Sequence, residues 1–363
     1  MRPATGLATA AAALALGVFA LAAGAGRAQN TVNVDGSACM RQGGGTADVV
    51  QRAQAFAGAL TPAQRQAASL EYSKANAGKW SNLPVNMTPR NGVRFGDMTA
   101  PQQQAAEALI SAAMSSCGRT LFDSLRAADG VLSKINPASS WNAGNYYVAF
   151  VGQPSATGPW ILQVSGHHLA YNIAYNGREV SATPLFDGVE PLRFTGLDGK
   201  AYEPLADQTR AMRNLSRMLE AYPQAKLEGT FRDVTRGPTN AGDVNFPLTY
   251  PTGTTGRGVR YADLTNDRKA LVRAAMQAWV ELPSQAISRP LMRDYTSDAA
   301  LAETFIGVSG ASSLDTPGGY VRIDGPRVWI EFIVQTAVAD RSQIHFHTIW
   351  RDKTADYGGA FKG

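Results

Sequence analysis

One eight-residue segment occurs twice in this chain, at Gly92–Thr99 and again 166 residues later at Gly258–Thr265. The copies differ only by exchanges between similar residues, such as Phe95 for Tyr261. In both copies the final threonine precedes apolar residues at helical spacing, so it can serve as a helix N-cap. Gln102 follows Thr99 by three residues, which completes a capping-box pattern. The repeat therefore predicts two halves with related local structure.

Strand-like segments follow each copy. They are rich in β-branched and aromatic residues and are interrupted by glycine and proline, which is typical of antiparallel hairpins. In the first half these segments are Tyr146–Phe150 and Trp160–His168. In the second half they are Tyr320–Ile323 and Trp329–Val334, followed by the segment that contains His345 and His347.

We therefore predict an α+β fold. Helices are expected at about 45–135, an antiparallel sheet at about 140–205, further helices at 205–220 and 262–282, and a second sheet at about 300–350. The halves, about 85–205 and 250–355, are expected to form one compact, pseudo-duplicated domain over residues 46–360.

The N-terminus resembles an export signal. An apolar stretch, Leu7–Ala25, follows Arg2 and ends in small residues at Gly26–Ala28, with no acidic residue before Asp35. This pattern predicts a signal peptide over residues 1–28, followed by an N-terminal arm over residues 29–45. A transmembrane anchor is the alternative, because the stretch is almost long enough to span a bilayer. No later apolar run is that long, so we expect a periplasmic or secreted protein that is not membrane-embedded after signal removal.

Charge and cysteine content fit that expectation. Removal of residues 1–28 would lower the formal charge from +5 to +3, and no block of basic residues occurs, so nucleic acid is not an expected partner. Cys39 and Cys117 both remain. In an oxidising compartment they are expected to form one disulfide between the N-terminal arm and the end of the first long helix. Two buried free thiols are the alternative.

All four histidines lie in two tight pairs, His167-His168 and His345-x-His347. Imidazole is a common ligand of transition metals, so the pairs can meet in the fold to bind one ion, zinc or copper. On a strand, His345 and His347 would face the same side. His167 and His168 would face opposite sides unless Gly166 bends the chain. We expect imidazoles of the two pairs within about 6 Å of each other. Structural histidines are the alternative.

A carboxylate is expected to complete the ligand set. Glu190 is the first candidate, and Asp187, Asp352 and Asp356 remain possible. Arg351 can bind a carboxylate or phosphate of a small, anionic substrate through its planar guanidinium group, or it can pair with Asp352 or Asp356. Asp352 can orient a histidine by accepting its free N–H group. Arg351 and Asp352 are therefore the candidate catalytic residues.

The chain resembles the domain of unknown function 3500 family over about residues 45–360. The motifs that carry this resemblance are Trp80, Pro84, Arg90–Gly92, Trp160, Ser165–Leu169, Pro184–Pro191, His345–His347, Arg351–Asp352 and Asp356–Gly358. The segment Cys117–Arg119 and Lys353 depart from the family pattern, and both lie outside the histidine pairs. The resemblance implies an exported bacterial α+β protein and no particular activity.

Three functions fit the sequence. The first is an exported metalloenzyme that performs metal-activated hydrolysis or copper redox chemistry. The second is a periplasmic protein that binds a metal or a small ligand without turnover, and the third is a structural protein. A serine hydrolase is poorly supported, because Ser165 and His167 share a strand but lack an evident orienting acid and oxyanion donors.

Overall fold

The computed structural model describes residues 1, 39, 43–137, 140–238, 242–311 and 313–361. The chain separates into two units, residues 1–32 and 33–363, and every described residue except Met1 belongs to the second. The expected signal peptide therefore lies outside the described residues, apart from Met1. Within the described residues, no helix combines the length and apolar character needed to cross a bilayer.

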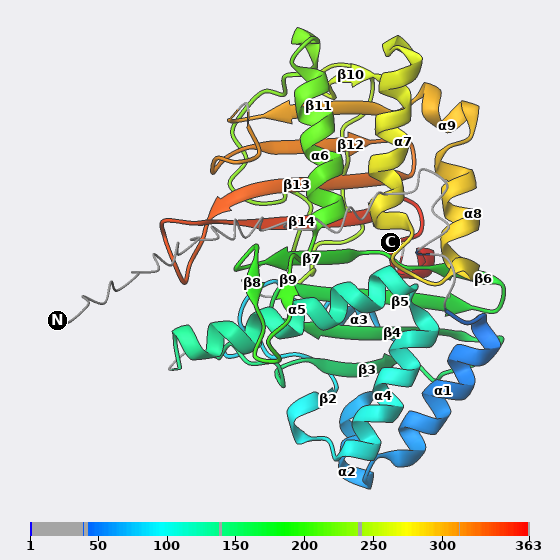
Figure 1. Ribbon diagram of the computed structural model, residues 1–363. Coiled ribbons are helices and arrows are strands. Elements are labelled where there is room, and N and C mark those ends of the chain that lie inside the picture. The colour runs from blue at the N-terminus through cyan, green and yellow to red at the C-terminus, as the bar shows by residue number, and fades with distance from the viewer. Residues whose placement is uncertain (2–38, 40–42, 138–139, 239–241, 312, 362–363) are drawn as a thin grey trace. The chain divides into compact units, whose positions relative to one another are not determined.

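Helices occur in all three regions expected from the sequence, and two more, α8 and α9, follow the last of these regions (Figure 1). The helices are α1 (Thr46–Ala59), α2 (Pro62–Ala68), α3 (Lys74–Ala77), α4 (Ala100–Ala113), α5 (Ser116–Ile135), α6 (Ala206–Leu219), α7 (Asn266–Val280), α8 (Gln285–Tyr295) and α9 (Asp298–Ala302). Short 3₁₀ turns are η2 (Phe95–Asp97), η3 (Pro223–Ala225), η4 (Tyr261–Asp263) and η5 (Asp356–Gly359). Helix α4 starts directly after Thr99, whose amide donates to Gln102 Oε1 at 2.8 Å, and α7 starts directly after Thr265. Both caps lie where the repeat predicted them.

Nearly all strands belong to one large mixed sheet. The strands are β1 (Ser69–Leu70), β2 (Val93–Arg94), β3 (Tyr147–Val151), β4 (Pro159–Gly166), β5 (Leu169–Asn176), β6 (Glu179–Ser181), β7 (Leu185–Val189), β10 (Val259–Arg260), β11 (Phe305–Ser309), β12 (Tyr320–Asp324), β13 (Val328–Thr336) and β14 (Ile344–Asp352). Their main order is β1-β3-β4-β5-β7-β14-β13-β12-β11-β10, with β2 beside β3 and β6 beside β5. A separate hairpin joins β8 (Phe194–Thr195) to β9 (Ala201–Tyr202). The α+β class is confirmed, but the two expected sheets are one.

The antiparallel pair β7–β14 joins the two groups of strands, with His347 opposite Gly188. Outward from this junction, one side runs β5, β4, β3 and β2, and the other runs β13, β12, β11 and β10. Counted outward from this junction, β3 and β11 hold the same place in the strand order. The sequence had suggested a match between Tyr146–Phe150 and Tyr320–Ile323, which lies in β12.

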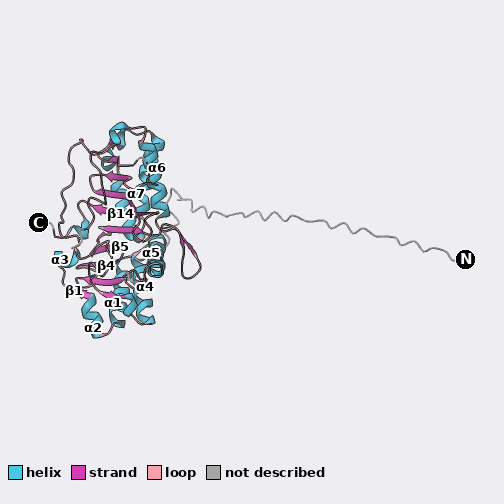
Figure 2. Ribbon diagram, turned by 90° about the vertical axis from the view of Figure 1, so that its left-hand side faces the viewer, coloured by secondary structure: helices cyan, strands magenta, loops and turns pink. Residues whose placement is uncertain are grey.

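The two faces of the sheet have different covers. Figure 2 shows the long helices together on one side, which we call the helix face, and irregular segments on the other side, which we call the loop face. The main hydrophobic core lies on the helix face, where Val189, Phe346 and Trp350 belong to it. A smaller cluster that includes Trp80, Phe186, Val234 and Ile349 lies on the loop face. Because successive side chains along a strand point to opposite faces of the sheet, neighbouring strand residues contribute to different clusters.

The Cys39–Cys117 disulfide is present. Cys117 lies in the first turn of α5, however, and not at the end of the first long helix. The helical region breaks at Met114 and Ser115, where the Ser115 side chain accepts a hydrogen bond from the Gly118 amide and starts a new helix. The disulfide thus joins Cys39 to the start of α5.

Gly258 is expected to be essential for the second repeat copy. It has a φ of +106°, and a Cβ at this position would lie 2.1 Å from the Ile306 carbonyl oxygen of β11. Gly253 also has a positive φ, +68°, but a Cβ there would meet no atom within 4 Å. Gly253→Ala should therefore cost only the conformational penalty, about 1–2 kcal/mol. Gly258→Ala should cost more because β10 must also move, and chemical denaturation of both variants measures the difference. Equal costs would contradict this account of the glycine.

Candidate metal centre

His167 and His168 form the two-residue turn between β4 and β5, since Gly166 pairs with Leu169. His168 has a φ of +58°, a left-handed conformation that is uncommon outside glycine. Three hydrogen bonds hold this turn. Gly166 O accepts from Arg90 Nη2 at 2.9 Å, His167 O from the Tyr146 hydroxyl at 3.1 Å, and His168 O from the Gly188 amide at 2.8 Å. The expected bend thus occurs in the turn itself. A hydrogen bond to each of three successive carbonyl oxygens holds the backbone of this turn.

His345 and His347 lie near the start of β14, and their side chains are on the loop face. Phe346, between them, packs in the core on the helix face. His347 and Phe186 form an edge contact, with ring centroids 5.3 Å apart. Gly188 provides the space in which the two histidine pairs meet. A Cβ on Gly188 would lie 2.7 Å from His168 Cδ2 and 2.9 Å from His347 Cδ2. Any larger residue there would push these rings apart.

Three imidazoles converge, as the sequence predicted for the two pairs. His168 Nε2 and His347 Nε2 are 3.2 Å apart, and one ring nitrogen from each of His168, His345 and His347 lies within 4.8 Å of the others. Two nitrogens bound to one ion at about 2.0–2.1 Å lie roughly 3.3 Å apart at a tetrahedral angle. The His168–His347 pair therefore has the spacing of two ligands on one ion, and the three side chains together form a group that could hold it.

The other ring nitrogens of two of these histidines are already engaged. His345 Nδ1 lies 2.9 Å from the Thr336 carbonyl oxygen, and His347 Nδ1 lies 2.9 Å from Asp233 Oδ1. Each Nδ1 is the donor to these acceptors, and in a neutral ring this leaves a lone pair on Nε2. Metal-binding histidines usually donate their second nitrogen in this way, to a carboxylate or a backbone carbonyl.

The three rings are almost completely buried, with 4–7% of each residue exposed. Burial, followed by the neighbouring histidines, holds the pKa of His168 well below its usual range. Burial and the adjacent His347 likewise lower the pKa of His345 to about 3. These two rings are therefore neutral near pH 7, which is the protonation state required for metal binding.

His167 and Glu190, both expected as ligands, lie beside the group but outside it. His167 Nδ1 lies 2.7 Å from Asp129 Oδ1 on α5, and its ring stacks on His168. Glu190 accepts hydrogen bonds from the amides of Val338 and Ala339 in the β13–β14 turn, and its Oε2 is 3.9 Å from His345 Nδ1. In this structure, both side chains are thus used to support the surrounding backbone and rings.

Arg351 and Asp352 are also engaged in structural contacts. Arg351 is fully buried on the loop face, where Nη1 bonds to Asp356 at 2.6 Å and Nη2 pairs with Asp243 at 2.8 Å. Asp352 is fully buried on the helix face and accepts from the Tyr295 hydroxyl and from Arg327, at 2.7 and 2.6 Å. Among the described residues, neither Arg351 nor Asp352 forms a hydrogen bond or ion pair with the three histidines. Arg351 thus forms the pair with Asp356 that the sequence left open.

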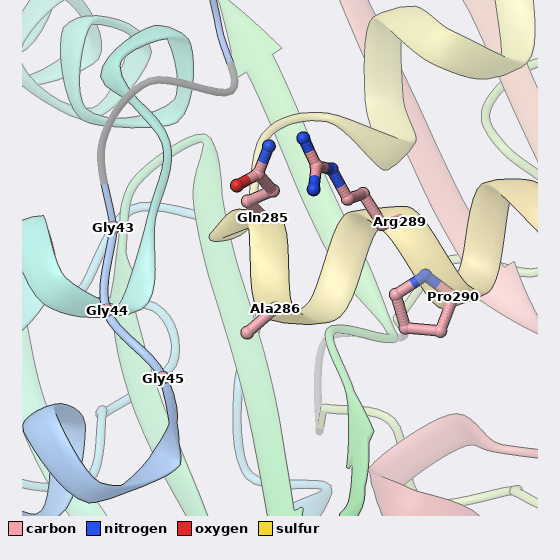
Figure 3. Close-up of a pocket in the computed structure, with 7 residues that line it drawn as sticks. All are labelled: Gly43, Gly44, Gly45, Gln285, Ala286, Arg289 and Pro290. Carbon is pink, nitrogen blue, oxygen red and sulfur yellow. The ribbon is translucent and has the colours of Figure 1, made fainter.

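Asp233 and Gly188 are the site residues that sequence reasoning missed. Asp233 lies between η3 and β10 in a long irregular segment without periodicity, so no pattern marked it. Gly188 stands within a motif that carried the family resemblance, but its role depends on the pairing of β7 with β14. A cavity elsewhere is lined by the backbone of Gly43–Gly45 and by residues 285, 286, 289 and 290 of α8 (Figure 3). It contains no histidine or acidic residue and is not part of this centre.

Asp187, on the helix face of β7, is fully buried, and neither carboxylate oxygen forms a hydrogen bond of normal geometry with a described residue, although the Tyr171 hydroxyl lies close enough to interact with it. Burial raises the pKa of Asp187 to about 8, against a smaller opposing effect of Tyr171. The folded state therefore holds a proton on this carboxyl between about pH 4 and pH 8, where the unfolded chain does not. This carboxyl contributes less stability as pH rises through that window.

Asp187→Asn is expected to stabilise the protein, because it removes the cost of ionising a buried carboxyl. The difference in free energy of unfolding between the variant and the wild type should be small at pH 4 and should grow towards pH 8, by at most about 1.4 kcal/mol per pH unit. Urea denaturation across this range measures it, with Asp123→Asn on the exposed side of α5 as a control. A pH-independent difference would show that Asp187 is ionised in the folded state.

Comparisons with known proteins agree with the resemblance seen in the motifs. Comparison with curated proteins gives no match, and neither does comparison with solved structures. The family described as "Protein of unknown function (DUF3500)" matches residues 42–359, which include every histidine. The chain belongs to this family.

Proposed function

We propose that this protein binds one transition-metal ion, zinc or copper, through Nε2 of His168, His345 and His347. One observation carries the proposal. One nitrogen from each of three buried imidazoles lies within 4.8 Å of the others, while the second nitrogens of His345 and His347 lie 2.9 Å from the acceptor oxygens of Thr336 and Asp233. Zinc and copper both accept imidazole ligands, so the residues present fit either ion.

We further propose that the centre is catalytic. Three protein ligands leave a coordination position for water or substrate, as in zinc enzymes with three histidines. Such an ion supplies Lewis-acid chemistry for hydrolysis, and copper also supplies redox chemistry. In this proposal His347 is oriented by Asp233, His345 by the Thr336 carbonyl, and the site accepts a small molecule. Arg351 and Asp352 are not assigned catalytic roles, because other residues already hold both side chains.

A second function is favoured by the burial of the centre. Only 4–7% of each ligand residue is exposed, which supports metal storage or transfer without turnover. The two proposals differ in whether the loaded protein converts a substrate. Zinc-loaded protein tested on ester and phosphoester substrates, and copper-loaded protein tested for oxygen consumption with a reductant, would separate them.

We infer that the protein is exported and consists of two related halves. The disulfide supports an oxidising compartment. The matching strand order on both sides of β7–β14 supports the duplication, as does an equivalent bond in each half. Phe95 N donates to Tyr146 O at 2.7 Å, and Tyr261 N donates to Thr304 O at 2.8 Å. The histidine pairs do not occupy equivalent positions in these halves, since one lies in the β4–β5 turn and the other on β14.

Elemental analysis of the purified protein tests the metal proposal. The wild type is expected to contain about one zinc or copper per chain, and His347→Ala should lose nearly all of it. Asp233→Asn should weaken binding by about 10–100-fold, because it removes the carboxylate that orients His347. Asp340→Asn, an exposed change in the β13–β14 turn, serves as the matched control. Full metal content in His347→Ala would refute the site.

Gly188→Ala should remove metal binding without removing a ligand. The new methyl group would overlap the rings of His168 and His347, so their Nε2 atoms could no longer lie 3.2 Å apart. Gly130→Ala is the control, because a Cβ there would have only ordinary contacts at 3.6 and 3.7 Å. Zinc titration should show a large loss of affinity for Gly188→Ala and none for Gly130→Ala. Unchanged affinity in Gly188→Ala would exclude shared coordination by these two rings.

A further inference from the structure

We propose that His167 is a positioning residue and not a fourth ligand, and that its ring holds His168 in the orientation that the metal requires. This inference rests on the proposed metal centre and assigns a role to the remaining histidine.

The three proposed ligands differ in how their rings are held. Hydrogen bonds from Nδ1 fix the rings of His345 and His347. His168 has no such bond to a described residue, and its one ring contact through nitrogen is with His347 Nε2. The backbone of His168 is fixed by the Gly188 amide, but that bond leaves the side-chain torsions free. Another contact must therefore set the plane of this imidazole.

Stacking on His167 is the closest such contact. The rings of His167 and His168 lie 3.7 Å apart between centroids, with an angle of 25° between their planes, whereas the rings of His347 and His345 lie 5.1 and 5.7 Å from His168. His167 is itself fixed by Asp129 at 2.7 Å, and it lies nearly parallel to Trp141, with centroids 5.9 Å apart. Asp129 is only 2% exposed and comes from the middle of α5. Asp129 on α5 thus holds the ring of His167, and the stacked ring of His167 in turn holds the plane of His168.

The same geometry argues against coordination by His167. The lone pair of an imidazole nitrogen lies in the ring plane, so a bound ion lies close to that plane. The rings of His167 and His168 are stacked at 3.7 Å, so their lone pairs run side by side, whereas the ring of His345, inclined to His168 by a similar 26°, lies 5.7 Å away. His167 Nδ1 is also occupied by Asp129, and none of its nitrogens falls within the group formed by His168, His345 and His347.

The test uses Cu²⁺ as the probe, with binding measured by titration and coordination by electron paramagnetic resonance. His167→Ala removes the stacked ring, and should weaken Cu²⁺ binding by about 10–100-fold and alter the copper spectrum. His167→Phe keeps a ring but has no ligand atom, so it should remain within about threefold of the wild type with a wild-type spectrum. His168→Ala, which removes a ligand, provides the reference for loss of coordination.

Two controls separate positioning from general destabilisation. Tyr202→Ala removes one ring of the Phe194–Tyr202 stack in the β8–β9 hairpin, at a 5.2 Å centroid distance, and should not change Cu²⁺ binding. Asp129→Asn keeps the size of the side chain but weakens its bond to His167, and should alter the spectrum in the direction of His167→Ala. If His167→Ala fails to fold, His167→Phe and Asp129→Asn still decide the matter.

Two results would overturn the inference. If His167→Phe loses as much affinity as His168→Ala, then His167 is a ligand. If His167→Ala binds Cu²⁺ with the affinity and spectrum of the wild type, then the stack has no role in coordination. Failure of the metal proposal itself is distinct, because the wild type would then bind neither Cu²⁺ nor Zn²⁺.

Discussion

The antiparallel pairing of β7 with β14 is the contact on which the rest of the arrangement depends. It joins strands from the two halves of the chain into one sheet, and it places His347 opposite Gly188. Gly188 in turn binds the carbonyl of His168 through its amide. One backbone register thus brings together residues that are 179 positions apart. A slip of one residue would direct His345 and His347 to the helix face, away from His168.

The cost of burying a charge separates the buried polar groups that have structural roles from those that are available to bind an ion. A buried charge is tolerated when it has partners, as Arg351 has in Asp243 and Asp356. The same holds for Asp352 with Arg327. His168 and His345 differ, because burial lowers the pKa of each, so that these rings are neutral near pH 7 and avoid the cost of a buried charge. Neutral nitrogens without a complete set of protein partners are suited to bind an ion.

Sequence reasoning predicted that the two histidine pairs would converge, which three of the four histidines do, but it did not predict how each is held. Periodicity was sufficient for His345 and His347, because alternation along a strand determines that they share a face. It failed for His167 and His168, which lie in a turn where alternation does not apply. Glu190 was chosen for its place in a motif, yet the β13–β14 turn uses its carboxylate to bind two amides. Such a use depends on which loop packs beside it, and no local pattern encodes that.

By itself, the sequence determined the α+β class, the capped helices after Thr99 and Thr265, the disulfide partners and the family. These features follow from local composition, spacing and the small number of cysteines. Only the tertiary structure decided that the two strand groups form one sheet, that Asp233 supports His347, and that His167 stacks on His168. The physical reason is that these depend on strand register and on packing between distant segments. Side-chain identity limits which of those contacts can form, but the positions of the folded backbone decide which of them do form.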